Sequence, residues 1–271
     1  MEIIGYLCSM LIGLSLGLIG SGGSILTVPV LVYLFGVSAV TATAYSLFIV
    51  GLTSAIGSIN YFRNGLVNLR IALVFGLPSI VAVFMTRAYL VPAIPDTLFS
   101  LNGLVITKGI LLLVLFALLM IAASYSMIKP SKTNTNSSTS ALATDTANLN
   151  YPMIIAEGLI VGTLTGLVGA GGGFLIIPAL VLLSKLDMKQ AVGTSLVIIA
   201  LKSLIGFLGE SNETGVNWGL LLSVSVFAIV GIFVGATLAK RVDGNKLKPA
   251  FGWFVLVMGI YIIVKELFFH H

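Results

Sequence analysis

The sequence predicts an all-α polytopic membrane protein built from two inverted repeats of about four hydrophobic segments each. Hydrophobic residues make up 58% of the 271 residues and charged residues only 8%, whereas a soluble domain carries about 25% charged residues. Apolar stretches long enough for the roughly 30 Å hydrocarbon core recur along the chain. An internal duplication completes the prediction, because a glycine-rich motif breaks the first hydrophobic segment of each half.

Eight hydrophobic segments follow one another, at about 3–36, 39–60, 70–91, 104–128, 153–184, 191–208, 218–239 and 250–268. Between the fourth and the fifth, the Ser/Thr/Asn-rich stretch 129–152 cannot bury a core, and we expect a flexible cytoplasmic linker there. The predicted organisation is a first transmembrane repeat over 1–128, this linker, a second repeat over 153–269 and a tag remnant at 270–271.

The two halves match when the sequence is shifted by 149 positions. GLIGSGGSILTVPVL at 17–31 aligns with GLVGAGGGFLIIPAL at 166–180, and the register holds without a gap for about fifty residues. The matched pairs are Gly17 and Gly166, Gly20 and Gly169, Gly22 and Gly171, Gly23 and Gly172, Pro29 and Pro178, Ala42 and Ala191, Ser46 and Ser195, Leu47 and Leu196, Gly57 and Gly206, Val67 and Val216, and Asn68 and Asn217. Paired glycine-interrupted hydrophobic segments are typical of secondary transporters.

The length of the first segment indicates how the halves are oriented. Residues 3–36 would form a helix of about 51 Å, too long for one crossing. The glycines divide this segment into pieces of about 17 and 12 residues, which predicts a re-entrant hairpin or a pair of short, tilted helices. Both termini are then external, and the positive-inside rule places four Lys/Arg clusters in the cytoplasm, at 61–70, 129–132, 185–189 and 240–248. Arg87, near an external loop, is the exception.

Composition excludes several other classes of protein. The single Cys8 rules out an internal disulfide and a multi-cysteine metal site, and we expect no cofactor. The net charge of +5 lies mostly in loops, which indicates membrane topology rather than a nucleic-acid surface. The opening MEIIGYLCSML carries an acid and no base, so we expect a retained segment rather than a cleaved signal.

The broken helices predict an anion site. A helix that restarts after GSGGS, near Ser24, or after GAGGG, near Phe174, presents backbone N–H groups and about half a positive charge. Two such ends would converge near the midplane of the bilayer. The residues expected there are Gly20, Ser21, Gly22, Gly23 and Ser24 from the first copy, and Gly169, Ala170, Gly171, Gly172 and Gly173 from the second. Close helix packing is the alternative explanation for such glycines.

Polar side chains inside the spans extend the predicted site. Thr43, Ser46, Thr194 and Ser195 either line the same cavity or bond back to their own helices. Lys202 is the only base well inside a span, and it either attracts the anion or snorkels towards the outer face. Glu157 is interpreted as the only acid within a span, close to its boundary.

The doubled glycine motif followed by a proline, the matched A-x-x-x-S-L segments and the two four-segment halves resemble the sulfite exporter TauE/SafE family. The resemblance covers the chain except the linker and the terminal histidines. It implies a protein of the bacterial cytoplasmic (inner) membrane that moves sulfite and small organosulfur anions, such as sulfonates, usually outward.

We therefore predict a secondary transporter that exports a small sulfur-containing anion by alternating access around a midplane site. Its expected partners are that anion and membrane lipid, with no nucleic acid, and a homodimer is compatible with the sequence. An anion channel is one alternative, and an uptake carrier for thiosulfate or a sulfonate, coupled to a proton or cation, is another. An enzyme is not expected, because the chain has no internal His, metal-ligand cluster or paired carboxylates.

Overall fold

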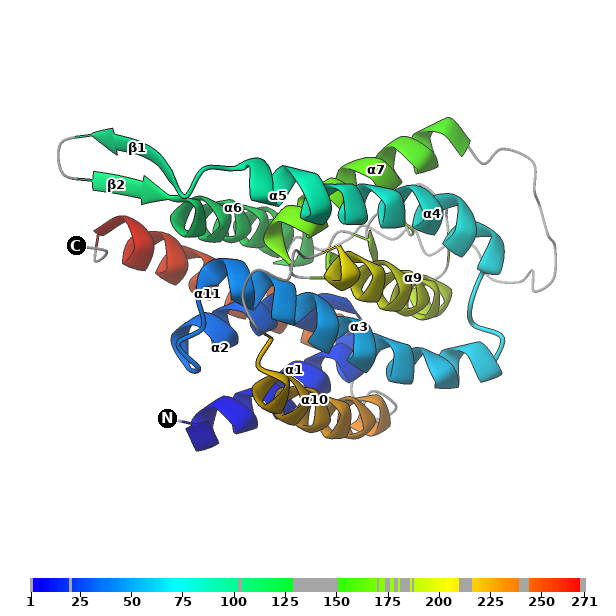
Figure 1. The fold of residues 1–271 in the computed structure, drawn as a ribbon. Coiled ribbons are helices and arrows are strands. Elements are labelled where there is room, and N and C mark those ends of the chain that lie inside the picture. Colours follow the sequence, from blue (N-terminus) through cyan, green and yellow to red (C-terminus); the bar gives the residue numbers. More distant parts are fainter. Residues whose placement is uncertain are drawn as a thin grey trace.

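The computed structural model describes residues 2–19, 21–101, 104–128, 151–169, 171–173, 176–177, 180, 186, 188–209, 216–238 and 244–268. Within these residues the chain is a bundle of long helices with one small β-hairpin (Figure 1). Residues 129–150 of the linker predicted over 129–152 lie outside the described part, as do residues 269–271, and the last two residues of that prediction, Tyr151 and Pro152, begin α7 instead.

The helices of the first half are α1 (Glu2–Ile19), the 3₁₀ helix η1 (Ser21–Leu26), α2 (Thr27–Tyr33), α3 (Ala39–Arg63), α4 (Leu69–Met85), the π-helical turn η2 (Thr86–Leu90), α5 (Val91–Ala93) and α6 (Lys108–Ile128). Those of the second half are α7 (Tyr151–Val168), α9 (Met188–Leu208), α10 (Trp218–Leu238) and α11 (Gly244–Phe268). Four stretches among the described residues are long and apolar enough to cross a membrane, namely Ala39–Arg63, Leu69–Ala93, Lys189–Leu208 and Trp218–Leu238. The prediction of a helical membrane protein is therefore confirmed.

Side-chain caps define where two of the long helices begin. The Ser38 hydroxyl accepts a hydrogen bond from the Thr41 N–H at 3.2 Å, so α3 starts at Ala39. The Asn68 side chain accepts from the Ile71 N–H at 3.1 Å, so α4 starts at Leu69. Both caps satisfy backbone donors that have no partner within the first helical turn.

The chain between α5 and α6 departs from the helical prediction. Strand β1 (Thr97–Leu101) pairs antiparallel with β2 (Leu104–Thr107), with Phe99 opposite Ile106. The predicted segment 104–128 therefore divides into a strand and a helix. Three consecutive β-branched residues, Val105, Ile106 and Thr107, favour the extended conformation over a helical turn.

The first glycine-interrupted segment returns to the end of the bundle where it began. Helix α1 ends at Ile19, the 3₁₀ turns of η1 follow, and α2 begins only at Thr27, later than the expected Ser24. The rings of Tyr6, near the start of α1, and Phe35, just after α2, pack edge to face with centroids 5.5 Å apart.

Helices of the two halves interlock rather than forming separate bodies. Helix α1 packs against α10, α4 packs against α7 and α9, α3 packs against α9 and α10, and α6 packs against α11. In Figure 1, α3 runs from left to right while α9 beside it runs from right to left. The largest buried clusters accordingly combine side chains from both halves, as in the contact region of Phe75, Ile154 and Ile198.

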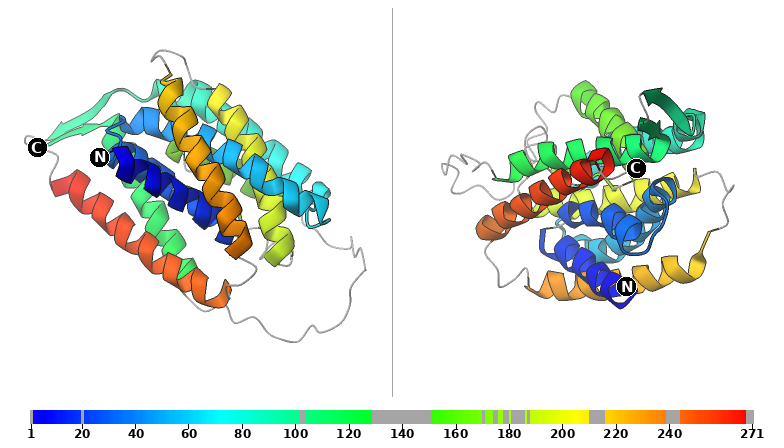
Figure 2. Two further views of the ribbon diagram at one scale, coloured as in Figure 1. Left: turned by 90° about the horizontal axis from the view of Figure 1, so that it is seen from below. Right: turned by 90° about the vertical axis from the view of Figure 1, so that its left-hand side faces the viewer.

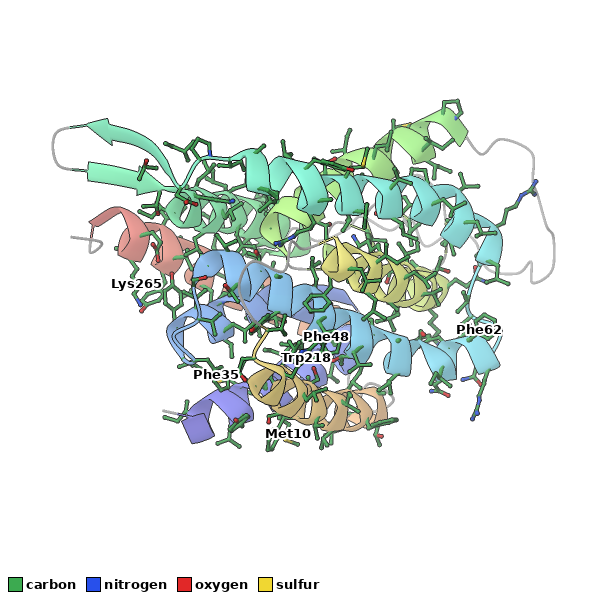
Figure 3. All side chains as sticks on the ribbon, viewed as in Figure 1. Met10, Phe35, Phe48, Phe62, Trp218 and Lys265 are labelled. Carbon is green, nitrogen blue, oxygen red and sulfur yellow. The ribbon has the colours of Figure 1, made fainter. Side chains whose placement is uncertain are left out.

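Both chain ends lie at one end of the bundle. Figure 1 and the left view of Figure 2 place the N- and C-termini on the side of the β-hairpin, opposite the α3–α4 turn. We call these the Asp96 end and the Arg63 end, after an exposed residue at each. In Figure 3, Phe62 lies at the Arg63 end and Lys265 at the Asp96 end.

Candidate anion-binding site

The second glycine motif changes the direction of the backbone after α7. Gly169, Gly171 and Gly172 have φ values of +73°, +67° and +63°, which L side chains rarely adopt. The Gly169 N–H donates to the Thr165 carbonyl at 2.7 Å and closes the last turn of α7. The Gly172 carbonyl then accepts from the Ile176 N–H at 3.2 Å, which is the spacing of a new α-helical turn.

Helix α3 of the first half lies directly against this motif. The Ser46 hydroxyl donates a hydrogen bond to the Gly169 carbonyl. A Cβ on Gly169 would lie 2.5 Å from the Thr43 Cα, and one on Gly171 would lie 2.5 Å from a methyl of Val50. Only glycine therefore allows this approach, and the motif sits between the two halves.

Lys202 brings a positive charge to the same place. Its side chain is fully buried, and its ammonium group donates to the Thr165 hydroxyl at 3.1 Å. A Cβ on Gly172 would lie 2.8 Å from Lys202 Nζ. The lysine therefore points to the second glycine motif instead of snorkelling to the membrane surface.

Two buried serines lie on α3 and α9, the helices that carry Ser46 and Lys202. Ser54 and Ser203 are both 0% exposed, and neither hydroxyl has a hydrogen-bond partner among the described residues. They stand 149 positions apart, so they are counterparts in the duplicated register, and Ser203 follows Lys202 directly. Buried hydroxyls of this kind usually bind water or a polar ligand.

The other predicted site residues divide between several environments. Thr43 and Ser195 donate to carbonyls of their own helices, Val40 at 2.7 Å and Val192 at 2.9 Å. The Thr194 hydroxyl accepts from the Asn68 N–H at 2.9 Å. In the two motifs, Ser21, Gly22 and Gly23 belong to η1, Ser24 is fully buried in η1, Gly173 is buried after Gly172, and Gly20 and Ala170 lie outside the described residues.

The sequence analysis missed Thr165, Ser54 and Ser203. The shift of 149 could have identified the two serines, because TSAIG at 53–57 aligns with KSLIG at 202–206. It also placed no acid but Glu157 within a span, and this was wrong for the last helix. Glu266 in α11 is only 3% exposed and accepts from the Tyr33 hydroxyl at 3.0 Å.

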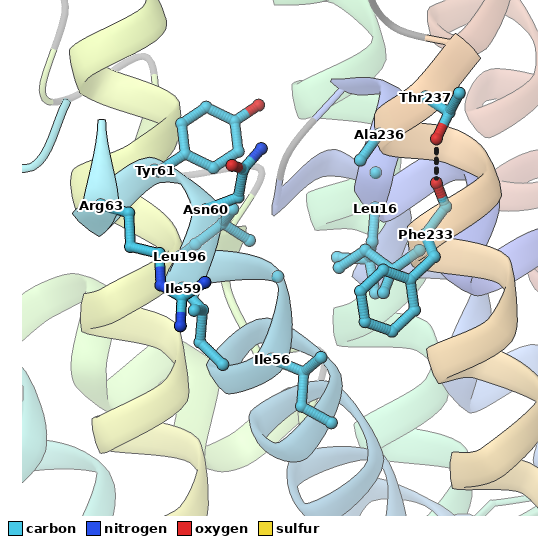
Figure 4. Close-up of a pocket in the computed structure, with 13 residues that line it drawn as sticks. Leu16, Ile56, Ile59, Asn60, Tyr61, Arg63, Leu196, Phe233, Ala236 and Thr237 are labelled. Atoms are coloured by element: carbon cyan, nitrogen blue, oxygen red, sulfur yellow. Dashed lines mark hydrogen bonds between the residues drawn. The ribbon is translucent and has the colours of Figure 1, made fainter. Parts of the chain in front are cut away.

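A cavity of about 380 Å³ opens near the Arg63 end, between α1, α3, α9 and α10 (Figure 4). Leu16, Leu196 and Ile232 supply an apolar wall, and the exposed Arg63 lies at the surface. The full lining is Leu16, Gly17, Ile56, Gly57, Ile59, Asn60, Tyr61, Arg63, Leu196, Ile232, Phe233, Ala236 and Thr237.

Long apolar helices that enclose a polar centre define a multi-pass membrane protein. Within the described ranges, no three His, Cys, Asp or Glu side chains come together as a metal site.

The model of the family "Sulfite exporter TauE/SafE" matches residues 6–262, and the chain therefore belongs to this family. A probable membrane transporter protein of Xylella fastidiosa strain Temecula1 is 30% identical over 265 residues, covering 94% of this chain and 92% of the relative. The probable membrane transporter protein YdhB of Bacillus subtilis is 29% identical over 259 residues, covering 95% and 98%. No solved structure matches significantly. Family and relatives describe a membrane transporter rather than an enzyme.

Proposed function

We propose that this transporter exports a small sulfur-containing anion, such as sulfite or an organosulfonate, by alternating access around the Lys202 centre. The buried lysine carries the proposal. A charge inside a membrane protein is costly and is usually retained for function. An anion bound between Lys202, Thr165 and the Gly172 backbone would offset that cost.

Matched hydrogen bonds support an inverted repeat as the basis of the mechanism. The Asn68 N–H donates to the Thr194 hydroxyl at 2.9 Å, and its counterpart Asn217 donates in the same way to Tyr45 at 2.6 Å. Tyr45 and Thr194 are themselves 149 positions apart. Both asparagine side chains also cap their helices, with acceptor distances of 3.1 Å.

Helix packing gives the same support on a larger scale. Exchanging the halves converts the α1–α10 pair into the α7–α4 pair and leaves α3–α9 and α6–α11 as pairs. Counterpart helices run in opposite directions in Figure 1. Alternating access in such proteins is a rocking of one repeat against the other around a fixed site.

Charge distribution supports a cytoplasmic Arg63 end in a bacterial inner membrane. Arg63, Arg70 and Lys189 lie at this end, at the turns that begin or end α3, α4 and α9. The positive-inside rule favours their retention in the cytoplasm. Both termini are then external.

Export in this direction needs no coupling ion. With the cell interior negative, an outward-moving anion gains about 2.3 kcal/mol per charge per 100 mV. Uptake would instead require a coupled proton or cation.

Purified protein in liposomes tests the proposal through sulfite and sulfonate flux. Lys202→Gln keeps a hydrogen-bonding side chain but removes the charge, and charged hydrogen bonds contribute about 1.5–3 kcal/mol. We expect flux at low substrate concentration to fall by roughly 10- to 100-fold. Lys189→Gln, on the exposed start of the same helix, is the control. Unchanged flux in Lys202→Gln, or large unitary currents in the unmodified protein, would contradict an anion carrier centred on Lys202.

A further inference from the structure

The cavity at the Arg63 end has a counterpart region at the Asp96 end. A Cβ on Gly17 would lie 2.5 Å from the Ile232 carbonyl oxygen beside the cavity. A Cβ on its counterpart, Gly166, would lie 3.2 Å from the carbonyl oxygen of Val83, the counterpart of Ile232. The sequences IVAVF at 80–84 and IVGIF at 229–233 keep the same register through these contacts. The counterpart of the cavity therefore lies between α3, α4, α7 and α9.

Arg87 occupies this counterpart region. Shifted by 149 positions, Arg87 corresponds to Ala236, which lines the cavity at the Arg63 end. The arginine is 0% exposed. A Cβ added to Gly209, directly after α9, would lie 3.4 Å from the Arg87 Cβ. At one end of the bundle the small Ala236 side chain leaves space for a cavity, whereas at the equivalent position of the other half the long Arg87 side chain is buried.

The backbone differs between the copies at the same place. Residues 86–90 form the π-helical turn η2, whereas α10 continues as an α-helix to Leu238. A π-helical turn inserts one residue into a helix, and such turns are frequent at functional sites. It directs Arg87 against α9, while the adjacent Thr86 would contact a Cβ on Gly166 at 2.7 Å.

We propose that Arg87 is the barrier at the outer end of the transport pathway. In this structure the pathway has a cavity at the Arg63 end and a buried arginine in the equivalent outer region. The outward-open state forms when the Arg87 side chain leaves this counterpart region, creating an outer cavity lined by Val83. This inference rests on the proposed alternating-access function, and it accounts for a basic residue that lies against the positive-inside pattern.

Cysteine labelling in a Cys8→Ser background tests the barrier without any substrate. Val83→Cys reports the outer region and Ile232→Cys the inner cavity, each with a membrane-impermeant maleimide added from its own side. Both side chains are buried, at 0% and 2% exposed, but only position 232 lines a cavity, so with Arg87 present we expect slower labelling at 83 than at 232. Arg87→Ala should speed labelling at 83 by about tenfold, a shift that small population changes can produce, with equal or slower labelling at 232. Arg87→Lys, which keeps a long cation, should leave position 83 slow.

The reciprocal variant keeps the test decisive if Arg87→Ala fails to fold. Ala236→Arg places an arginine in the inner cavity and should slow labelling at 232 by about tenfold. No effect of either variant, or faster labelling at both positions in Arg87→Ala, would overturn the barrier. Because labelling requires no anion, it can succeed while the flux assay fails, and the two proposals are separable.

Discussion

Gly172 combines two requirements that only glycine meets. Its φ of +63° is unfavourable for any L side chain, and a Cβ there would overlap the Thr165 hydroxyl and lie 2.8 Å from Lys202 Nζ. Gly36 has a similar φ of +67° but no neighbouring atom within 4 Å of a Cβ. A comparison of Gly172 with Gly36 therefore separates the effect of backbone strain from the effect of crowding at the candidate site.

Replacing each of these glycines by alanine should have different consequences. Both variants carry the strain of a left-handed residue, roughly 1–2 kcal/mol. Gly172→Ala should also displace Thr165 or Lys202, so we expect sulfite flux to fall at least about tenfold while Gly36→Ala stays near the unmodified level. Flux and melting temperature of both proteins give the measurement. Equal flux in the two variants would show that Gly172 serves the fold only.

Sequence patterns pointed to part of the candidate site at this scale. The glycine motifs and Lys202 were recognisable because glycine and charge are rare inside apolar spans. Thr165 was not, because a lone threonine in an apolar helix usually bonds to its own backbone, as Thr165 also does with Val161 at 2.6 Å. Its hydroxyl also accepts a hydrogen bond from Lys202 on another helix, and the sequence around Thr165 does not predict that contact.

Helices α1 and α10 approach each other along facing glycines. A Cβ on Gly13 would overlap the Ala228 carbonyl, and one on Gly231 would overlap the Met10 carbonyl. Both helices carry the G-x-x-x-G spacing, at 13–17 and 231–235. Small residues at this spacing allow the close backbone contact that stabilises helix pairs in lipid. Glycine therefore serves packing here and a polar centre elsewhere in the same chain.

A side chain at this interface should destabilise the protein. Overpacking costs typically 1–3 kcal/mol and more where backbone must move, so Gly231→Val should lower the melting temperature in detergent by several degrees, about 2–4 °C per kcal/mol. Gly219→Val, on the exposed first turn of the same helix, is the matched control, because its nearest neighbour lies 3.5 Å away. A melting temperature equal to that of the control would contradict the packing role.

The positions of the long helices could be predicted well, since hydropathy alone locates a span. The β-hairpin and the π-helical turn could not. Strand β2 shares its apolar character with the helix that follows, and its pairing with β1 depends on a non-local register. The π-helical turn η2 has no distinguishing composition, and its packing against α7 is a tertiary contact that the local sequence does not encode.

At the scale of the whole molecule, the proposed inverted repeat determines on which side of the membrane each end of the bundle lies. Phe62, at the Arg63 end, and Asp96, at the opposite end, are both exposed. If the halves are inverted and the termini external, as proposed, these residues lie on opposite sides of the membrane. The sequence predicted this orientation from charges and segment lengths, but it could not indicate which helices of the two halves would pack together.

Single cysteines at these positions test the orientation. In a Cys8→Ser background, Phe62→Cys should be labelled by an impermeant maleimide only from the cytoplasm, and Asp96→Cys only from outside. Intact cells and inverted vesicles give the two measurements. Labelling of both from the same side would contradict the proposed topology.

The interlocking of the halves also affects how the protein is made. Helices α1 and α4 find their principal neighbours in α10 and α7, which the ribosome supplies only later. During synthesis, α1 and α4 therefore lack these neighbours until α7 and α10 have been made. Helix α6 packs against α11, the last helix of the chain, so neither half has all its neighbouring helices until translation ends. We therefore expect the helix contacts of the bundle to be completed late in folding.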